Sequence, residues 1–104
     1  MNIENLKTEE VYSIHEIILS PLQVSDYINH SIANKFWMVI SGNGIATLNT
    51  VDFTLTPGHT MLVPLGANHL VANTSDTDVL KIIEIRTGEN LTRDEVSVVM
   101  NNQV

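Results

Sequence analysis

The sequence predicts an all-β fold in which short antiparallel strands form a sandwich or a barrel, and three observations predict this class. Turn signals built from Gly, Pro, Asn, Asp and Ser recur about every eight to twelve residues. The segments between the turns are short and contain few aromatic residues. Their apolar residues are mostly Ile, Val and Leu, and β-branched side chains suit pleated, half-buried strands.

About eight segments between the turns are rich in Val, Ile, Leu and Thr, and we expect each to form a strand. They are residues 11–19, 24–30, 36–41, 45–49, 53–56, 60–63, 69–73 and 79–86. One of the turns is expected at residues 51–52. Near the C-terminus, TRDE at residues 92–95 matches the capping box that opens a helix, whereas the alternating valines that follow suit a strand. This end is therefore either a short C-terminal helix or an edge strand.

With 104 residues, 43% of them hydrophobic, the chain is expected to form a single domain, residues 1–104, with its core over about residues 11–88. The formal net charge is −7 and there is no run of Lys or Arg, so we expect no nucleic acid and no membrane as partners. The absence of cysteine excludes disulfides and thiol chemistry. Neither a secretion signal nor a membrane span is apparent, so a cytoplasmic location is expected.

The most informative stretch is residues 58–73, which reads GHTMLVPLGANHLVAN. Gly58 permits a tight turn, and Pro64 with Gly66 ends a strand, so that His69 re-enters the barrel pointing inward. The stretch matches the second cupin motif at every fixed position, namely Gly58, Pro64, Gly66, His69 and Asn73. The chain thus resembles the cupin superfamily, which implies a double-stranded β-helix, or jelly-roll, barrel.

A closer resemblance is to the C-terminal cupin domain of type II mannose-6-phosphate isomerases, which is often fused to mannose-1-phosphate guanylyltransferase. The similar region covers about residues 26–99 and includes WMVISG at 37–42, FTLT at 53–56, the turn at 64–69 and IIEIRTGENL at 82–91. The resemblance implies a role in carbohydrate or polysaccharide metabolism.

In that family a Gln, a His, a Glu and a second His are implied to hold a metal, and the matching positions here are Ile28, His30, Lys35 and His69. Ile28 cannot coordinate, and the ammonium of Lys35 repels a divalent ion where a carboxylate attracts one. Catalytic zinc sites normally have three protein ligands. We therefore expect a residual site, His30 and His69, that binds no metal or only a weakly held divalent metal.

The same pocket is expected to bind a ligand through Lys35, Trp37, His69 and Ile28, because a cation in an apolar cup can anchor a phosphate or carboxylate. Alternatives stay open for three of these residues. Lys35 can extend to solvent, Trp37 can pack in the core instead of stacking on a sugar, and His69 can be a packed core residue.

Five further residues are weaker candidates. The resemblance implies a basic residue at Ala33 and a histidine at Phe36, at the mouth of a sugar-phosphate site, and neither is present here. His15 and His59 are expected to be ordinary surface or half-buried residues. Turn chemistry accounts for Asn68.

Two functions are compatible with these residues. The first is a stand-alone binding or regulatory module that holds a sugar, a sugar phosphate or another small anion in the barrel. The second is a metal-dependent aldose–ketose isomerase, with His30 or His69 as the base that moves the proton. We also expect a homodimer, because residues 11–19 form an apolar strand with an exposed edge.

Overall fold

The computed structural model describes residues 2–8, 12–30, 33–88 and 96–98, and over these residues it contains strands and no helix. The all-β prediction is confirmed. The described strands are β1 (Asn2–Thr8), β2 (Tyr12–Leu19), β3 (Ile28–His30), β4 (Asn34–Ser41), β5 (Gly44–Leu48), β6 (Val51–Leu55), β7 (Thr60–Val63), β8 (Asn68–Asn73), β9 (Leu80–Thr87) and β10 (Val96–Val98). Within this part of the chain no helix is long and apolar enough to cross a membrane.

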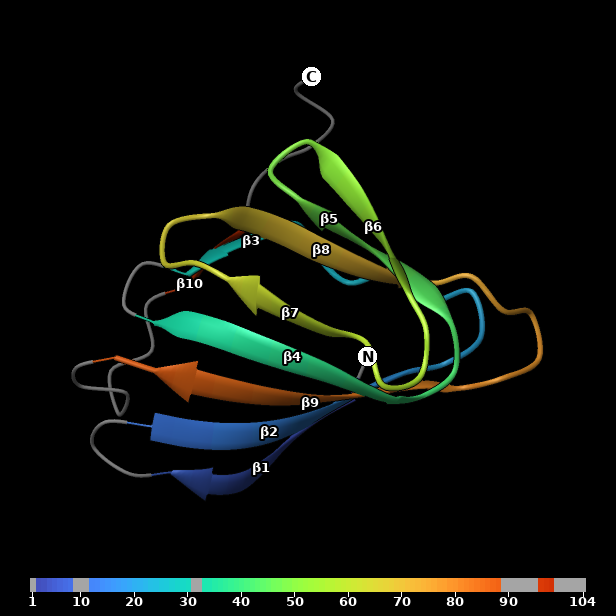
Figure 1. Ribbon diagram of the computed structural model, residues 1–104, viewed down its shortest axis with the longest axis horizontal. Helices are drawn as coiled ribbons and strands as arrows, with labels where there is room; N and C mark the ends of the chain where they lie inside the picture. The colour runs from blue at the N-terminus through green and yellow to red at the C-terminus, as the bar shows by residue number, and fades with distance from the viewer. Residues whose placement is uncertain (1, 9–11, 31–32, 89–95, 99–104) are drawn as a thin grey trace.

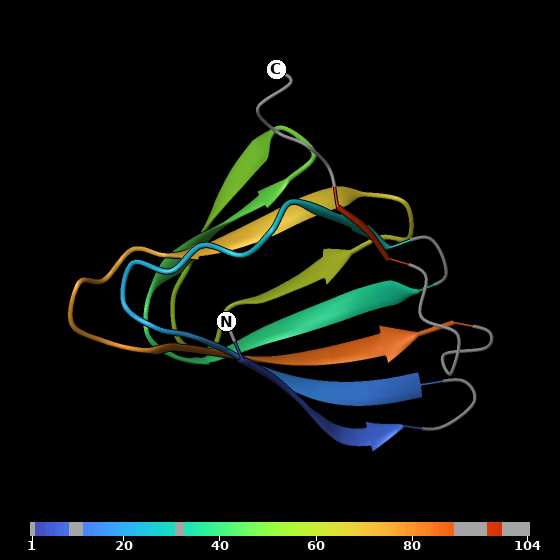
Figure 2. The ribbon, with the colours of Figure 1, turned by 180° about the vertical axis from the view of Figure 1, so that it is seen from behind.

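The strands form two antiparallel five-stranded sheets that face each other (Figures 1 and 2). The first sheet has the order β1-β2-β9-β4-β7 and the second has the order β10-β3-β8-β5-β6. Because successive side chains of a strand point to opposite faces, alternate residues are buried between the sheets along β2, in β4 up to Val39 and in β9 up to Glu84. The core combines side chains of both sheets, among them Leu19, Ile82, Leu55 and Val71.

The predicted strands are present, with two local differences. Of residues 24–30, only Ile28–His30 forms a strand, and Val24 makes an isolated bridge to Ala72. The hairpin turn expected at residues 51–52 lies instead at Asn49 and Thr50. Asn49 adopts φ 56°, a left-handed conformation that Asn tolerates better than most residues.

The N-terminal segment corrects a prediction. β1 pairs with β2 from Asn2 opposite Ile18 to Thr8 opposite Ser13, and β9 pairs with the other side of β2. The strand at residues 11–19 was expected to have an exposed edge, and this is wrong for the described part of it, residues 12–19. Polar and charged residues such as those of β1 are common on edge strands, where the backbone supplies the pairing.

The C-terminal segment supports one of its two alternatives. Val96–Val98 is an edge strand that pairs with β3, so the valines follow the strand reading and not the helix reading. The capping-box residues 92–95 lie outside the described residues.

The register of the first sheet creates polar rows on its inner face. Residues directly opposite each other on neighbouring strands share a face, so rows run across β2, β9 and β4. These rows are Ser13, Arg86 and Lys35, then His15, Glu84 and Trp37, and then Ile17, Ile82 and Val39. Two rows of polar or charged groups therefore lie beside an apolar row inside the barrel.

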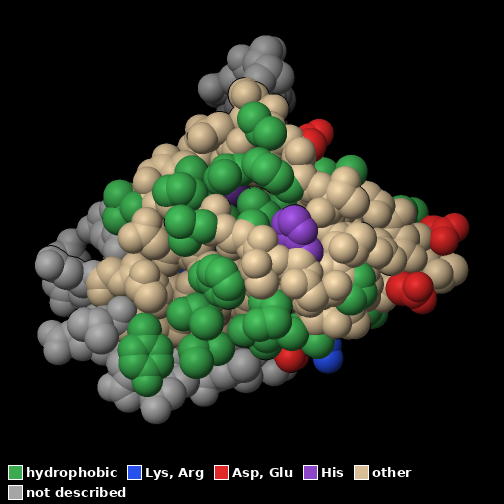
Figure 3. Space-filling model, viewed as in Figure 1, with side chains coloured by type: hydrophobic (Ala, Val, Ile, Leu, Met, Phe, Trp, Pro, Cys, Tyr) green, Lys and Arg blue, Asp and Glu red, His purple; other side chains and the backbone are tan. Residues whose placement is uncertain are grey.

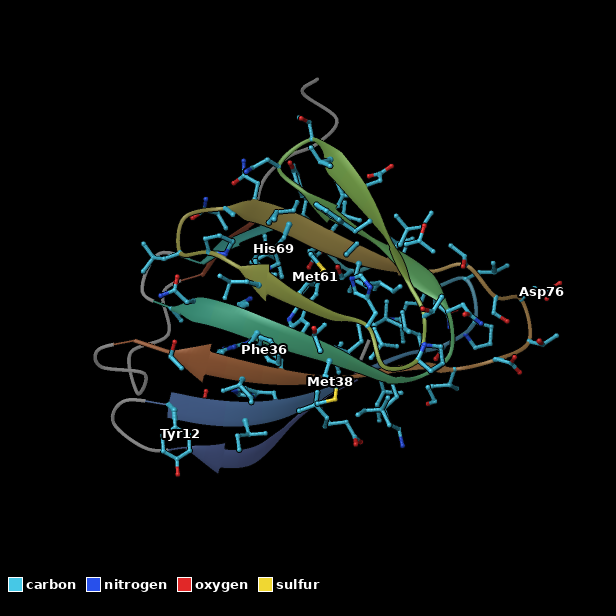
Figure 4. The ribbon with its side chains drawn as sticks, in the orientation of Figure 1. Tyr12, Phe36, Met38, Met61, His69 and Asp76 are labelled. Carbon is cyan, nitrogen blue, oxygen red and sulfur yellow. The ribbon has the colours of Figure 1, made fainter. Side chains whose placement is uncertain are left out.

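The second sheet brings His69 to these rows. Gly58 and Gly66 have φ of 86° and 84°, left-handed conformations that suit glycine, and the Ala67 amide donates to the Pro64 carbonyl at 3.1 Å. The motif therefore forms the turns that the sequence predicts. After the second turn β8 begins, and His69 is buried opposite Ile28 of β3. Figure 4 shows His69 on β8, in the sheet opposite β4.

Candidate functional site

Lys35 is a buried cation inside the barrel. Its side chain is 4% exposed, and its Nζ lies 2.9 Å from His69 Nε2 and 3.6 Å from Glu84 Oε1. The alternation of β4 places Lys35 on the inner face together with Trp37 and Val39. The alternative in which Lys35 extends to solvent is therefore wrong.

Glu84 is the negative charge of the site and is 1% exposed. Its Oε1 accepts a hydrogen bond from Trp37 Nε1 and its Oε2 accepts one from Arg86 Nε, both at 2.9 Å. Burial by itself raises the pKa of Glu84, but the positive charges of Lys35 and Arg86 and these hydrogen bonds hold the pKa below its ordinary value of 4.5. Glu84 is therefore ionised at neutral pH and is a counter-ion for both cations.

The hydrogen-bond partners of His69 assign its tautomer. Nδ1 lies 3.0 Å from the carbonyl oxygen of Ala67, which can only accept, so Nδ1 carries the proton. Nε2 is then the acceptor for the Lys35 ammonium. The ring of Trp37 contacts the imidazole edge to face, with 5.7 Å between centroids and 70° between planes. The lone pair of Nε2 thus points at Lys35.

The charged groups and apolar walls line a pocket of about 30 Å³, room for two or three water-sized groups. Its lining residues come from both sheets and from the segment before β3: Ile17, Ser25, Ile28, Lys35, Trp37, His69, Val71, Glu84 and Arg86. Arg86, at 12%, is more exposed than Lys35 or Glu84. Since the lining carries two cations and one carboxylate, it favours a small negative group over a positive one.

The described side chains at the family's metal positions do not fit a divalent ion. Ile28 lines the pocket without a donor atom, Lys35 brings a positive charge, and His69 directs its lone pair to that charge. For His30 only the backbone, in β3, is described, so its side chain lies outside the description. Among the described residues, no three His, Cys, Asp or Glu side chains gather as metal ligands would.

Of the other candidate residues, Trp37 lines the pocket, whereas Ala33 and Phe36 do not. Trp37 is a buried member of the core, as its packing interpretation predicts, and its ring also lines the pocket. Ala33 is buried, whereas Phe36 is 38% exposed on the outer face of β4 and points away from the pocket. The position that the resemblance places at the mouth of a sugar site is therefore on the opposite side of the sheet.

Of two polar residues away from the pocket, His59 is half-buried as expected, whereas Asn68 lies in a strand and not in the turn before it. Asn68 begins β8, and its Oδ1 accepts a hydrogen bond from Asn29 Nδ2 at 2.9 Å. His59 lies in the turn before β7, half-buried, and its backbone carbonyl accepts from the Val39 amide. Neither side chain lines the pocket.

The sequence interpretation missed the polar groups of β2 and β9. Glu84 and Arg86 line the pocket. His15 is buried with its Nε2 2.9 Å from Ser13 Oγ, although it was expected to be a surface or half-buried residue. The strand alternation contains the signal, because Leu80 and Ile82 are obvious core residues and positions 84 and 86 share their face.

Comparisons with known proteins agree with this architecture. The family model for the mannose-6-phosphate isomerase C-terminal domain matches residues 2–101. A mannose-1-phosphate guanylyltransferase from Klebsiella pneumoniae is 26% identical over 85 residues, which are 82% of this chain and 18% of that protein. The chain thus spans less than a fifth of the length of this curated relative.

Solved structures show the same fold. A cupin-2 domain protein from Rhodospirillum rubrum matches with a TM-score of 0.80 and 15% identity, over 96% of this chain and 66% of that one. A cupin superfamily protein from Desulfitobacterium hafniense matches with a TM-score of 0.75 and 14% identity, over 85% of this chain and 77% of that one. Because these structures share its architecture, the chain has a cupin fold. Because the family model matches residues 2–101, the chain belongs to the mannose-6-phosphate isomerase C-terminal family.

Proposed function

We propose that this chain is a cupin binding module that holds the phosphate or carboxylate of a small carbohydrate-like ligand without using a metal. The observation that carries the proposal is the 2.9 Å contact between Lys35 Nζ and His69 Nε2. It places an ammonium at the position where the family resemblance implies a carboxylate, and it engages the histidine that the family implies as a ligand.

The charges of the pocket support an anionic guest. Lys35 and Arg86 face one carboxylate, Glu84, so the lining itself is positively charged although the whole chain has a net charge of −7. A guanidinium and an ammonium are the groups that proteins use most for phosphate and carboxylate recognition. Inside an apolar pocket their attraction for an anion is screened less than at the surface.

The size of the pocket limits what can enter. A pocket of about 30 Å³ is far smaller than the several hundred Å³ of a site that encloses a whole small molecule. We therefore infer that only the acidic group of the ligand reaches Lys35, while the remainder stays at the mouth beside Arg86, the most exposed of the three charged residues.

The second function, a metal-dependent aldose–ketose isomerase, is not favoured by the described residues. A base must accept a proton from the substrate, and the lone pair of His69 Nε2 is already directed at Lys35. The donors that a divalent ion requires are also missing at positions 28 and 35.

Calorimetric titration of the purified chain tests the proposal. Inorganic phosphate and mannose 6-phosphate are expected to bind, unphosphorylated mannose is not, and EDTA should leave the affinities unchanged. Lys35→Met should weaken phosphate binding at least about tenfold, because a charge-assisted contact in a buried site is lost.

Two variants serve as controls for this titration. Asn43→Asp, in the turn between β4 and β5, lowers the net charge by one unit as Lys35→Met does, and it should keep the wild-type affinity. Lys35→Met combined with Glu84→Gln removes both charges of the pair, so it separates loss of the anion site from loss of folding. Equal affinity for mannose and mannose 6-phosphate, or binding only after a divalent metal is added, would show that the proposal is wrong.

A further inference from the structure

The outer face of the first sheet carries a contiguous apolar surface. Strand alternation places it opposite the inner polar rows, and we call it the apolar face. It consists of Ile14, Ile85, Phe36, Leu62, Ile83 and Met38, from β2, β9, β4 and β7. Phe36, Met38 and Leu62 are 38%, 40% and 59% exposed. Figure 3 shows hydrophobic side chains gathered on this side, and Figure 4, in the same orientation, shows Phe36 and Met38 over β4 and β9.

The strand register makes this surface continuous. Ile14, Ile85, Phe36 and Leu62 are successive cross-strand partners and form one unbroken apolar row, and Ile83 and Met38 form part of the next row. Directly opposite side chains lie about 5 Å apart, so these residues touch or nearly touch. Soluble proteins seldom expose large contiguous apolar surfaces unless another molecule covers them.

The charges beside the apolar face point to a second copy of the same chain. Glu16 of β2 flanks Ile83, and Lys81 of β9 lies in the following row, next to Ile18. One acidic and one basic group at diagonal positions are self-complementary: under a two-fold axis, Glu16 of each copy can meet Lys81 of the other. An anionic membrane offers no such match to a chain of net charge −7.

The dimensions of the molecule suit such a contact. The protein is flat, 37 × 33 × 19 Å, and the apolar face lies on its broad side, the side seen in Figure 1. A stable interface of ordinary size needs about 800 Å² from each partner, which a face of this extent can supply.

We propose that the apolar face is the interface of a homodimer in which Glu16 of one copy pairs with Lys81 of the other. From the sequence, a dimer was expected to form through the edge of the strand at residues 11–19, but β1 already pairs with that edge. The proposed interface uses the outer face of the sheet instead. The proposal is independent of what the pocket binds.

Sedimentation equilibrium of the full chain at about 50 mM salt, where surface charge pairs are weakly screened, tests the interface. The wild type should dimerise. Glu16→Lys and Lys81→Glu should each weaken the dimer about tenfold by setting like charges together, and the double variant, which exchanges the two charges, should restore the affinity. Met38→Glu should weaken the dimer by about a hundredfold or more, because it buries an unpaired charge.

A matched control is Val51→Glu, which places the same charge on an exposed apolar residue of the second sheet and should leave the dimer intact. Circular dichroism should show that all these variants stay folded, since each substituted side chain is at least partly exposed. A wild type that is still monomeric at about 100 μM, a concentration above the dissociation constants of most specific complexes, would overturn the proposal and assign the face to a different partner. A double variant as weak as the single ones would also overturn it.

Discussion

Lys35 places an ammonium where the family resemblance implies a carboxylate. This ammonium is hydrogen-bonded to His69 and lies 3.6 Å from Glu84. Burying an ammonium removes it from water, which costs several kcal/mol unless charges and hydrogen bonds replace the lost hydration. Glu84 supplies the charge and His69 an acceptor, so the cation can remain buried. Position 35 therefore carries a positive charge where the resemblance implies a negative one, which is the electrostatic basis of the proposed anion site.

A double substitution at this site should make the pocket favour metal ions over anions. Lys35→Glu with Ile28→Gln restores the Gln, His, Glu and His set that the resemblance implies, and it releases His69 from the ammonium. We expect this variant to bind Zn²⁺ or Mn²⁺ with one-to-one stoichiometry in calorimetry, while wild type shows no comparable binding. The physical reason is that a carboxylate offers the ion both a ligand and a charge.

Lys35→Met provides the comparison for this substitution, because it removes the positive charge without adding a ligand. It should bind the ions far more weakly than the double variant does. If the wild type bound the ions as tightly as the double variant, the ammonium would not be what discriminates against metal.

At the scale of the strand, alternation accounts for most of what the sequence could predict. The inward face of β4 places Lys35 and Trp37 in the barrel, and the Gly58 to His69 motif forms the turns that bring His69 opposite them. The same alternation shows why Phe36 points away from the pocket, although resemblance alone places it at a ligand site.

Other features of the elements could not be predicted from the sequence. β1 has no clear apolar period, and its pairing with β2 depends on backbone hydrogen bonds that any residue except proline can make. Arg86 and Glu84 acquire their role from partners on β4, which are distant in sequence and meet them only through the register of the sheet. Convergence of this kind is a property of the tertiary structure.

Two glycine turns provide a test at this scale. Gly42 and Gly58 both have left-handed φ, 88° and 86°, which costs an alanine about 1 kcal/mol. A Cβ on Gly42 would also lie 2.4 Å from the carbonyl oxygen of Val79, whereas a Cβ on Gly58 meets nothing within 4 Å. Gly42→Ala should therefore lower the free energy of unfolding by at least about 2 kcal/mol more than Gly58→Ala does, measured by urea denaturation. Equal losses would show that the backbone near Val79 moves aside easily.

For the molecule as a whole, the two sides of the first sheet have opposite chemistry. Its inner face holds a charged network around Glu84, and its outer face is apolar with Glu16 and Lys81 beside it. The inner network is buried and thus linked to folding, whereas the outer face is exposed and thus available for association. Lowering the pH should weaken the inner network by protonating Glu84.

The pH dependence of folding stability should reveal the charge of Glu84. Its pKa in the folded chain lies below the ordinary value of 4.5, so the ionised form stabilises the fold at neutral pH. This contribution is complete above about pH 5 and is lost as the pH falls below 4.5 toward the folded pKa, because the unfolded chain takes up the proton first.

Glu84→Gln should therefore be less stable than wild type at pH 7 by about 3 kcal/mol, and the two stability curves should approach each other between about pH 5 and 3. Urea denaturation at one fixed protein concentration measures this difference, because any contribution of dimerisation is then the same for wild type and variant. Trp37→Phe, which removes one hydrogen bond to Glu84, should show a smaller change of the same sign. Curves that stay parallel down to pH 3 would show that folding does not lower the pKa of Glu84.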